Sequence, residues 1–411
     1  MKNKKNYIYI SEPFMNTVLN SQVANLLELL DKEDIVFDLV ITTPLKYLLF
    51  NNKLRKKNIK HIKSTIKGKV YQIPVIKSND KTGISSLIKF IFLYFKYRRS
   101  DSIVIQTRSI KDYLALYLFK YFKNGIKIIF DYRGAVAEEF INGKGYKSVN
   151  LVNNKKIIKK YNSIIKEQDR MFTISSKIFC VSNKLEKYLN KISKNKFKKK
   201  LNVIPGGADS NHFFYDLKIR NINRQKLNLC EDNIVFVYSG RLDSFYINNN
   251  FLFELIKNIL LKIPNSIFLC LTPNLDLLNE IIINHKIPMS KVIGKHVHYN
   301  EINDYLNASD IGLMIREKIM TNYVASPTKI PEYLMSGLPI VISEDIGDYS
   351  DFVLKNNLGL VTGNDISKII NKIEKINELC SREDISKIVK QSYSKQSYLK
   401  KIINIYNEQV N

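Results

Sequence analysis

The stretch from Ile311 to Ile342, IGLMIREKIMTNYVASPTKIPEYLMSGLPIVI, predicts a complete strand–helix–strand unit. Its two ends, IGLMI and PIVI, are continuous apolar runs, which is typical of strands buried on both faces of a sheet. Between them we expect a helix that Ser326 caps, with Pro327 in its first turn. Gly337 suits the helix end. Strands joined by a helix run parallel, so this unit predicts an α/β fold.

The same alternation extends over the whole chain. The predicted strands are Tyr7–Ile10, Val36–Ile41, Ile103–Gln106, Ile126–Asp131, Ile178–Val181, Leu201–Ile204, Ile234–Ser239, Ser266–Leu271, Lys291–Ile293, Ile311–Ile315, Pro339–Ile342 and Gly359–Val361. The clearest predicted helices between them are Asn20–Leu30, Leu87–Tyr97, Tyr113–Phe122, Asn250–Lys262 and Ile366–Cys380. Two such series, which meet near Pro205, predict two doubly wound, Rossmann-like domains facing a central cleft.

We therefore divide the chain into three parts. Residues 1–205 form an N-terminal domain, residues 206–384 a second domain, and residues 385–411 an amphipathic helix expected to pack back on the first domain. Ligands of open α/β sheets bind beyond the carboxyl ends of the strands. The loops that follow the predicted strands are therefore where the chemistry is expected.

The positive charge of the chain is confined to its first half. The 411 residues carry a net charge of +27. Residues 1–205 hold 42 Lys and Arg against 15 Asp and Glu, whereas residues 206–411 hold 23 of each. A hydrophobic content of 45% excludes a disordered polycation. The asymmetry indicates an anionic partner for the first half: nucleic acid, an acidic polymer or an anionic membrane.

Nothing in the sequence predicts export or a membrane span. The basic N-terminus is followed by an apolar run too short for a signal peptide, and no stretch reaches the ~18 uncharged apolar residues of a spanning helix. The four cysteines are widely spaced and predict neither a zinc site nor a disulfide framework. We therefore expect a cytoplasmic protein, bound peripherally to the inner face of the cell membrane.

The helix that begins near Ser326 has the features of an anion site. The free N–H groups of a first helical turn hold anions, and Lys329 adds a full positive charge there. Glu332 lies three residues later on roughly the same face, where it suits ribose hydroxyls. Together with Pro327 and Thr328, these residues are interpreted as a clamp for a nucleoside diphosphate. The alternative is an ordinary capped surface helix with a Lys–Glu pair.

Two glycine-containing loops follow strands of the same region. Gly240 allows close backbone approach, and Arg241 beside it suits phosphate oxygens. Gly206 and Gly207 suit a turn that approaches a ligand, although a plain hinge turn between the domains explains them equally well.

These pieces, in this order, resemble the retaining nucleotide-sugar glycosyltransferases of family 4, which have the two-domain GT-B fold. The junction Pro205–Asp209 is similar to the family's Pro-x-Gly-x-Asp, and Gly240-Arg241 to its phosphate loop. The segment Tyr305–Ile315 is similar to its Asp-ending helix and strand. Glu332, followed by Ser-Gly-Leu-Pro at residues 336–339, matches the second half of its Glu-x7-Glu motif. The resemblance covers most of the chain.

The chain also departs from the family. Val324 stands where the first Glu of Glu-x7-Glu is expected, and Tyr246 stands at the family's phosphate-binding Lys, five residues after the Gly-Arg. Lys329 is expected to replace that charge. The chain resembles the branch with Ser-Pro-x-Lys before the Glu.

The resemblance implies a reaction without a metal or other cofactor, in which UDP- or GDP-linked sugar is the substrate. Arg241 and Lys329 would stabilise the leaving diphosphate. Asp131, where many members have a His, would orient the acceptor hydroxyl or donor sugar, and Arg133 would bind phosphate or hold Asp131. The alternative is a structural Asp–Arg pair. Glu138 lies nearby, although it also suits a helix N-terminus.

Further cleft residues are expected in the first loop and helix start: Glu12, Ser21 and Gln22. The lysine clusters 53–60, 155–160 and 194–200 indicate that the partner of this domain has an anionic surface, such as that of a membrane. The aromatic segment Leu87–Arg99 suits a membrane-surface helix, but its aromatics are better explained by a core helix against the sheet.

The resemblance thus implies a hexosyltransferase of the retaining class. Its acceptor would be a lipid-linked saccharide or a surface polysaccharide of the capsule, O-antigen or teichoic type. The alternatives are a nucleotide-sugar epimerase or other GT-B enzyme and, less favoured, a nucleic-acid-binding protein, for which no recognition module is visible.

Overall fold

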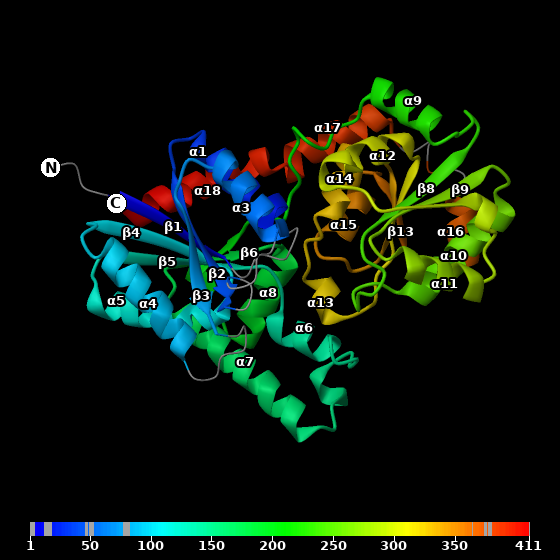
Figure 1. Ribbon diagram of the computed structural model, residues 1–411. Helices are drawn as coiled ribbons and strands as arrows, with labels where there is room; N and C mark the ends of the chain where they lie inside the picture. The colour runs from blue at the N-terminus through cyan, green and yellow to red at the C-terminus, as the bar shows by residue number, and fades with distance from the viewer. Residues whose placement is uncertain are drawn as a thin grey trace.

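The computed structural model describes residues 5–11, 19–45, 48, 53–76, 83–363, 365–373, 376 and 380–410. It contains two α/β units, each built on one parallel sheet (Figure 1). The predicted fold class, two doubly wound Rossmann-like domains, is confirmed. No helix among the described residues is long and apolar enough to cross a membrane.

The first sheet has seven strands in the order β3-β2-β1-β4-β5-β6-β7. Their bounds are β1 Lys5–Ser11, β2 Phe37–Pro44, β3 Val70–Val75, β4 Ser102–Thr107, β5 Ile126–Tyr132, β6 Lys177–Cys180 and β7 Leu201–Val203. The sequence did not predict β3, whose residues VYQIPV lack a continuous apolar run. As the edge strand it is only partly buried, and an edge also tolerates its proline.

Helices cover both faces of this sheet. One face carries α4 (Ile84–Tyr97), α5 (Tyr113–Phe122), α7 (Lys155–Ile174) and α8 (Asn183–Ile192), which pack through Leu93, Phe119, Phe172 and Leu185. The other face carries α1 (Asn25–Asp31), α3 (Lys53–Thr65) and the C-terminal α18 (Lys395–Val410). The short α6 (Val136–Asn142) follows β5.

The second sheet has six strands in the order β10-β9-β8-β11-β12-β13. Their bounds are β8 Ile234–Ser239, β9 Ser266–Leu271, β10 Val292–Lys295, β11 Ile311–Met314, β12 Ile340–Ser343 and β13 Gly359–Thr362. The helices of this unit are α9 Leu217–Lys226, α10 Asn249–Lys262, α11 Leu275–Asn284, α12 Ile302–Ala308, α13 Met320–Tyr323, α14 Lys329–Met335, α15 Tyr349–Lys355 and α16 Ile366–Ile373.

The C-terminal segment forms two helices. α17 (Arg382–Tyr393) packs on α14 in the second unit, with Ile385 and Val389 in its core. After Ser394 the chain crosses back, and α18 packs on β4 and α1 of the first unit. There Ile402 and Tyr406 are buried, and the Tyr406 hydroxyl bonds the side chain of Gln106.

The two crossings between the units lie side by side. The first runs through Gly206 and Gly207, and the second through Ser394. Lys395 N–H donates to Ala208 O (2.9 Å), Ala208 N–H donates to Tyr393 O (3.2 Å), and a parallel β-bridge joins Ala208 to Ser394.

Candidate functional site

The helix of the opening motif begins later than predicted. α14 starts at Lys329, and Thr328 is its N-cap residue without a capping hydrogen bond. The prediction that Ser326 caps this helix is therefore wrong. The Ser326 hydroxyl instead accepts a hydrogen bond from Gly206 N–H at 2.9 Å, which ties the loop to the crossing between the units. The helix end is as predicted, because Gly337 has a φ of +74° and follows its last turn.

Lys329 reaches back to the loop that follows β8. A Cβ atom at residue 240 would lie 1.8 Å from the Lys329 ammonium, and Gly240 has a φ of +146°. Only glycine therefore allows this approach. The ammonium lies 5.6 Å from the ring centre of Tyr238. Burial lowers the pKa of Lys329 to about 8; the charge of Arg316 adds to this effect, and Glu332 opposes it.

Arg316, which the sequence did not single out, supplies a second cation at the same place. It follows β11, and its guanidinium lies over the Tyr246 ring at 5.6 Å and donates to Asn322 Oδ1 at 2.9 Å. Its Nε has no hydrogen-bond partner in the described structure, and burial lowers its pKa. Among the described residues, neither Arg316 nor Lys329 has a carboxylate within ion-pair distance. We expected functional residues in the loops that follow the strands, and Arg316 lies in such a loop.

Glu332 lies on the inner face of α14 and is only 7% exposed. Burial raises its pKa to about 7, although Lys329, Lys395 and a hydrogen bond from Thr328 oppose that rise. A carboxyl group with this pKa is close to half protonated near neutral pH. In its protonated form it both donates and accepts hydrogen bonds and does not neutralise Lys329 or Lys395.

The Glu332→Gln variant is expected to be more stable than the parent protein at about pH 8, by up to about 3 kcal/mol, and nearly equal to it at about pH 4. When folding raises the pKa of an acid, ionisation of that acid lowers the free energy of unfolding. This loss is absent below the unfolded pKa and complete above the folded pKa. The gain should therefore develop as the pH rises from about 4.5 to about 7 and should stay constant above that range. Urea unfolding at several pH values measures it. Glu344→Gln, on an exposed carboxyl, is the control, and a pH-independent difference would contradict the assignment.

Arg241, which we predicted to bind phosphate, has an exposed side chain. Its side chain is 67% exposed and forms an ion pair with Asp243 at 2.5 Å. The backbone carbonyl of Arg241 accepts from the Tyr238 hydroxyl at 2.9 Å. The loop is thus fixed next to Lys329, while the Arg241 guanidinium faces solvent.

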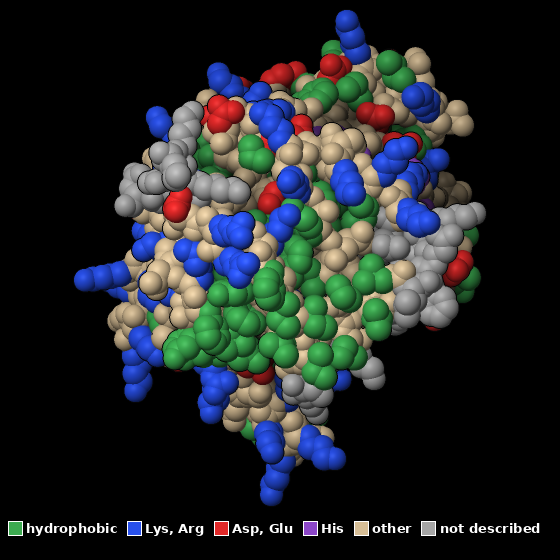
Figure 2. All heavy atoms as spheres, turned by 60° about the vertical axis from the view of Figure 1, so that its left-hand side comes forward, with side chains coloured by type: hydrophobic (Ala, Val, Ile, Leu, Met, Phe, Trp, Pro, Cys, Tyr) green, Lys and Arg blue, Asp and Glu red, His purple; other side chains and the backbone are tan. Residues whose placement is uncertain are grey.

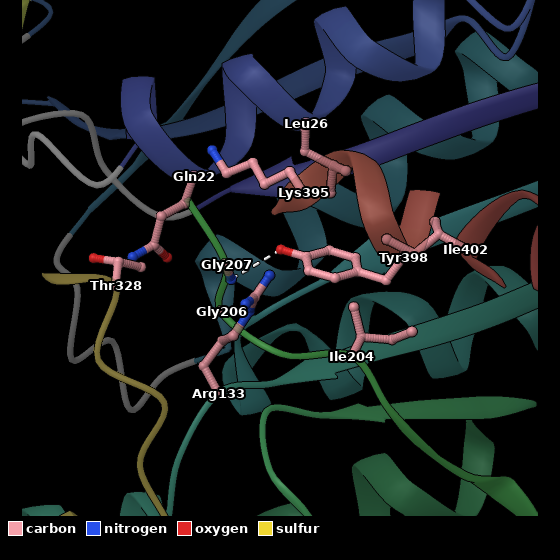
Figure 3. Close-up of a pocket in the computed structure, with 10 residues that line it drawn as sticks. All are labelled: Gln22, Leu26, Arg133, Ile204, Gly206, Gly207, Thr328, Lys395, Tyr398 and Ile402. Carbon is pink, nitrogen blue, oxygen red and sulfur yellow. Dashed lines mark hydrogen bonds between the residues drawn. The ribbon is translucent and has the colours of Figure 1, made fainter. Parts of the chain in front are cut away.

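The two junction glycines are explained by close packing at the crossings. A Cβ at Gly206 would lie 2.8 Å from Ser326 O, and one at Gly207 would lie 2.2 Å from Tyr393 O. Gly207 N–H also donates to the Tyr398 hydroxyl at 2.9 Å (Figure 3). These contacts support the alternative that the turn is a hinge between the units. Asp209, which follows, accepts hydrogen bonds from Asn25 (2.7 Å) and Gln396 (2.8 Å).

A pocket lies where the units meet (Figure 3). Gln22 and Arg133 reach it from the first unit, Thr328 from the second, and Lys395 from the second crossing. Burial lowers the pKa of Lys395 to about 8, which Asp209 and Glu332 oppose. Thr328 directly precedes Lys329 in the chain, so the pocket adjoins the Lys329 region. The sequence did not single out Lys395.

Asp131 is buried beneath this pocket rather than open to it. It is 1% exposed and lies 2.9 Å from Arg108 Nε and 2.7 Å from Arg133 Nε. The hydroxyl of Tyr9 donates to it at 3.3 Å. Burial alone would raise the pKa of Asp131, but the Arg133 and Arg108 guanidinium groups hold it below its usual value. The structure therefore favours the interpretation of Asp131 as the partner of an arginine pair.

Arg108 was missed because it lies 23 residues from Asp131 in the chain. It also donates to Gln22 Oε1 at 3.0 Å, which positions that predicted cleft residue. Arg133 keeps 27% of its side chain exposed on the pocket wall.

The remaining predicted acceptor residues are less accessible. Glu138 accepts hydrogen bonds from the hydroxyls of Tyr161 (2.8 Å) and Tyr188 (3.1 Å), so it joins α6 to α7 and α8. Glu12 lies outside the described residues, and so does the side chain of Ser21. Val324 is fully buried in the core of the first unit, and its carbonyl accepts from the Ser182 hydroxyl at 2.7 Å. The position of the family's first Glu thus serves domain contact.

Comparison with known proteins identifies the architecture. No family model and no curated protein matches the chain. Among solved structures, a glycosyltransferase from Rickettsia africae is 18% identical and covers 99% of both chains with a TM-score of 0.67. Anabaena HepE in complex with UDP-glucose is 13% identical and covers 98% of this chain and 100% of its own, with a TM-score of 0.69.

The lipopolysaccharide outer core galactosyltransferase WaaB is 11% identical, covers 98% of this chain and 99% of its own, and has a TM-score of 0.64. The chain has the GT-B fold. At these identities the likeness is one of fold, and it extends over both sheets of the GT-B architecture and the junction between them.

Proposed function

We propose that the protein is a glycosyltransferase that binds a nucleotide sugar between its two units. The observation that carries this proposal is the pair of cations, Arg316 and Lys329, at the carboxyl edge of the second sheet. Both are desolvated and neither has a carboxylate partner within ion-pair distance among the described residues. Buried charges are normally paired, so this place calls for an anion, and a diphosphate supplies two negative groups.

The placement of Arg316 fits this proposal. Its guanidinium covers the ring of Tyr246, the residue at the position where the resembled family has its phosphate-binding Lys. Arg316 therefore brings positive charge to the place where the sequence itself lacks it. Together with Lys329 it would stabilise the charge that develops on the leaving diphosphate. No step in this proposal uses a metal.

The nucleoside and the sugar would occupy the adjoining surfaces. Glu332, with its raised pKa, would receive or donate hydrogen bonds at ribose hydroxyls, next to Thr328. The pocket side chains Arg133, Gln22 and Lys395 would face the transferred sugar and the acceptor. We further propose retention of configuration, a UDP- or GDP-linked donor, and residues 1–205 and 206–384 as the acceptor and donor domains. The acceptor would be a lipid-linked saccharide or surface polysaccharide at the inner face of the membrane.

Thermal unfolding with nucleotides tests the proposal. UDP, GDP and their sugar conjugates are added singly, and one series is expected to raise the Tm by a few degrees at saturating concentration, because only the folded state binds. The Arg316→Met variant is expected to lose most of this shift. Arg170→Met, on an exposed arginine, is the matched control.

Absence of any nucleotide-dependent shift, or an undiminished shift in Arg316→Met, would contradict the site. Turnover of the bound sugar nucleotide without an acceptor would favour an epimerase over a transferase.

A further inference from the structure

The α4 helix packs one side against the core and leaves an apolar side exposed. Its buried residues are Ser85, Lys89, Leu93 and Tyr97, and Lys89 is neutralised there by Asp112 at 2.5 Å. The outer side carries Ile84, Leu87, Ile91 and Phe95, which are 44%, 48%, 44% and 66% exposed. These spacings of three and four residues form one continuous stripe. The preferred interpretation placed the aromatics of this segment in the core, and it holds for Tyr97, which is buried, and for Phe90, Phe92 and Tyr94, which pack against the core. It does not hold for Phe95.

The neighbouring helix α5 extends this apolar stripe into a surface. Leu114, Tyr117, Tyr121 and Phe122 are 41%, 44%, 73% and 58% exposed. The helices run in parallel, since a Cβ on Gly83 would contact Leu114 at 3.5 Å and the rings of Phe90 and Phe122 lie 5.6 Å apart. Figure 2 shows apolar side chains gathered on this side of the molecule with Lys and Arg around them. We call this the α4–α5 surface.

Cations border the α4–α5 surface. Lys96, Arg98, Arg99 and Lys120 are exposed, and the Arg98 guanidinium lies 5.4 Å from the Phe95 ring centre. Residues 84–123 contain eight Lys and Arg against two Asp, and one of the two acids is the buried Asp112. A second copy of this chain would oppose these positive charges with its own. An anionic bilayer complements both the apolar centre and the cationic border.

The position of the surface relates it to the cleft. α4 and α5 follow β3 and β4, so both helices begin at the carboxyl edge of the first sheet. That is the edge at which Gln22 and Arg133 line the pocket. The end of the α4–α5 surface nearest the cleft therefore carries Ile84, Leu87 and Leu114, whereas Phe95, Tyr121 and the bordering cations lie at the opposite end.

We propose that the α4–α5 surface docks on an anionic lipid bilayer, with the apolar stripe entering the interface and the cations contacting the head groups. This proposal rests on the proposed function only for the purpose of membrane binding, which would be to meet a lipid-linked acceptor. Binding itself follows from the surface alone.

Vesicle flotation with the full chain tests the docking. Vesicles containing phosphatidylglycerol are compared with vesicles of phosphatidylcholine alone. We expect binding to the former, weakened by added salt, and a loss of about tenfold or more in the double variant Phe95→Ser/Tyr121→Ser. The matched control is Leu261→Ser/Ile283→Ser in the second unit, whose side chains are 64% and 68% exposed. Both variants change exposed residues, so their folds should survive.

Equal flotation of the parent protein and the Phe95→Ser/Tyr121→Ser variant would overturn the proposal. Concentration-dependent dimerisation that this variant abolishes, with vesicle binding unchanged, would assign the surface to a second copy instead. The nucleotide-induced rise in Tm should be the same in both double variants. If the parent protein does not bind the vesicles but still shows the nucleotide-induced rise in Tm, the docking proposal is overturned and the proposed function stands.

Discussion

Lys329→Ala is expected to lower the rate of sugar transfer by at least about 100-fold while the protein remains folded. The ammonium of Lys329 lies against Gly240, close to Arg316, with no carboxylate partner within ion-pair distance among the described residues. It therefore costs stability in the free protein and is best explained by a bound anion. Removing it should remove charge stabilisation of the leaving diphosphate, without opening a hole in the core.

Steady-state transfer, measured as release of nucleoside diphosphate, checks this result. Lys318→Ala is the control, because Lys318 is 75% exposed and pairs with Glu344 on the surface. In the parent protein, donor affinity should fall as the pH rises through about 8, where Lys329 loses its proton. The variant should lack that fall. Transfer at the parental rate by a folded Lys329→Ala protein would exclude Lys329 from the site.

The second large effect is expected on stability. Asp131→Ala should reduce the free energy of unfolding by about 3–5 kcal/mol, because it leaves two largely buried guanidinium groups without their shared carboxylate. Arg108 and Arg133 lie within 3 Å of Asp131 and would repel each other in its absence. The hydrogen bond from Tyr9 would be lost as well.

Urea unfolding of the parent protein and the variant measures this difference. Asp169→Ala is the matched control, since Asp169 forms an exposed ion pair with Lys196 and should contribute only about 0–1 kcal/mol. Similar losses for the two variants would show that the arginine pair does not depend on Asp131. A stable Asp131→Ala protein without activity would instead return Asp131 to a catalytic role.

The fold was largely predictable because each buried parallel strand is a continuous apolar run. Only β3 was missed, since an edge strand needs no such run. The last segment was predicted as one helix, yet Ser394 separates α17 on one unit from α18 on the other. Amphipathicity alone does not reveal which partner a helix face meets.

The site was predicted less completely, for a physical reason. Lys329, Glu332 and Gly240 stand in recognisable motifs, whereas Arg316 and Arg108 are single charges whose meaning comes from neighbours distant in the chain. Similarly, α4 has apolar residues on more than one side, so only the packing shows that Lys89 lies inside and Phe95 outside. The roles of individual site residues remain predictions that the variants above address.

The paired crossings at Ala208 and Ser394 have a mechanical consequence. Because the chain passes twice between the units at adjacent points joined by backbone hydrogen bonds, a rotation of the units that keeps both links intact would have its axis near those points. Contacts away from the crossings, such as the burial of Val324 in the core of the first unit, would have to open in such a rotation, whereas the Ala208–Ser394 bridge would not. The two adjacent links therefore restrain sliding of one unit past the other, and with it the mutual alignment of the faces that carry Arg133 and Lys329.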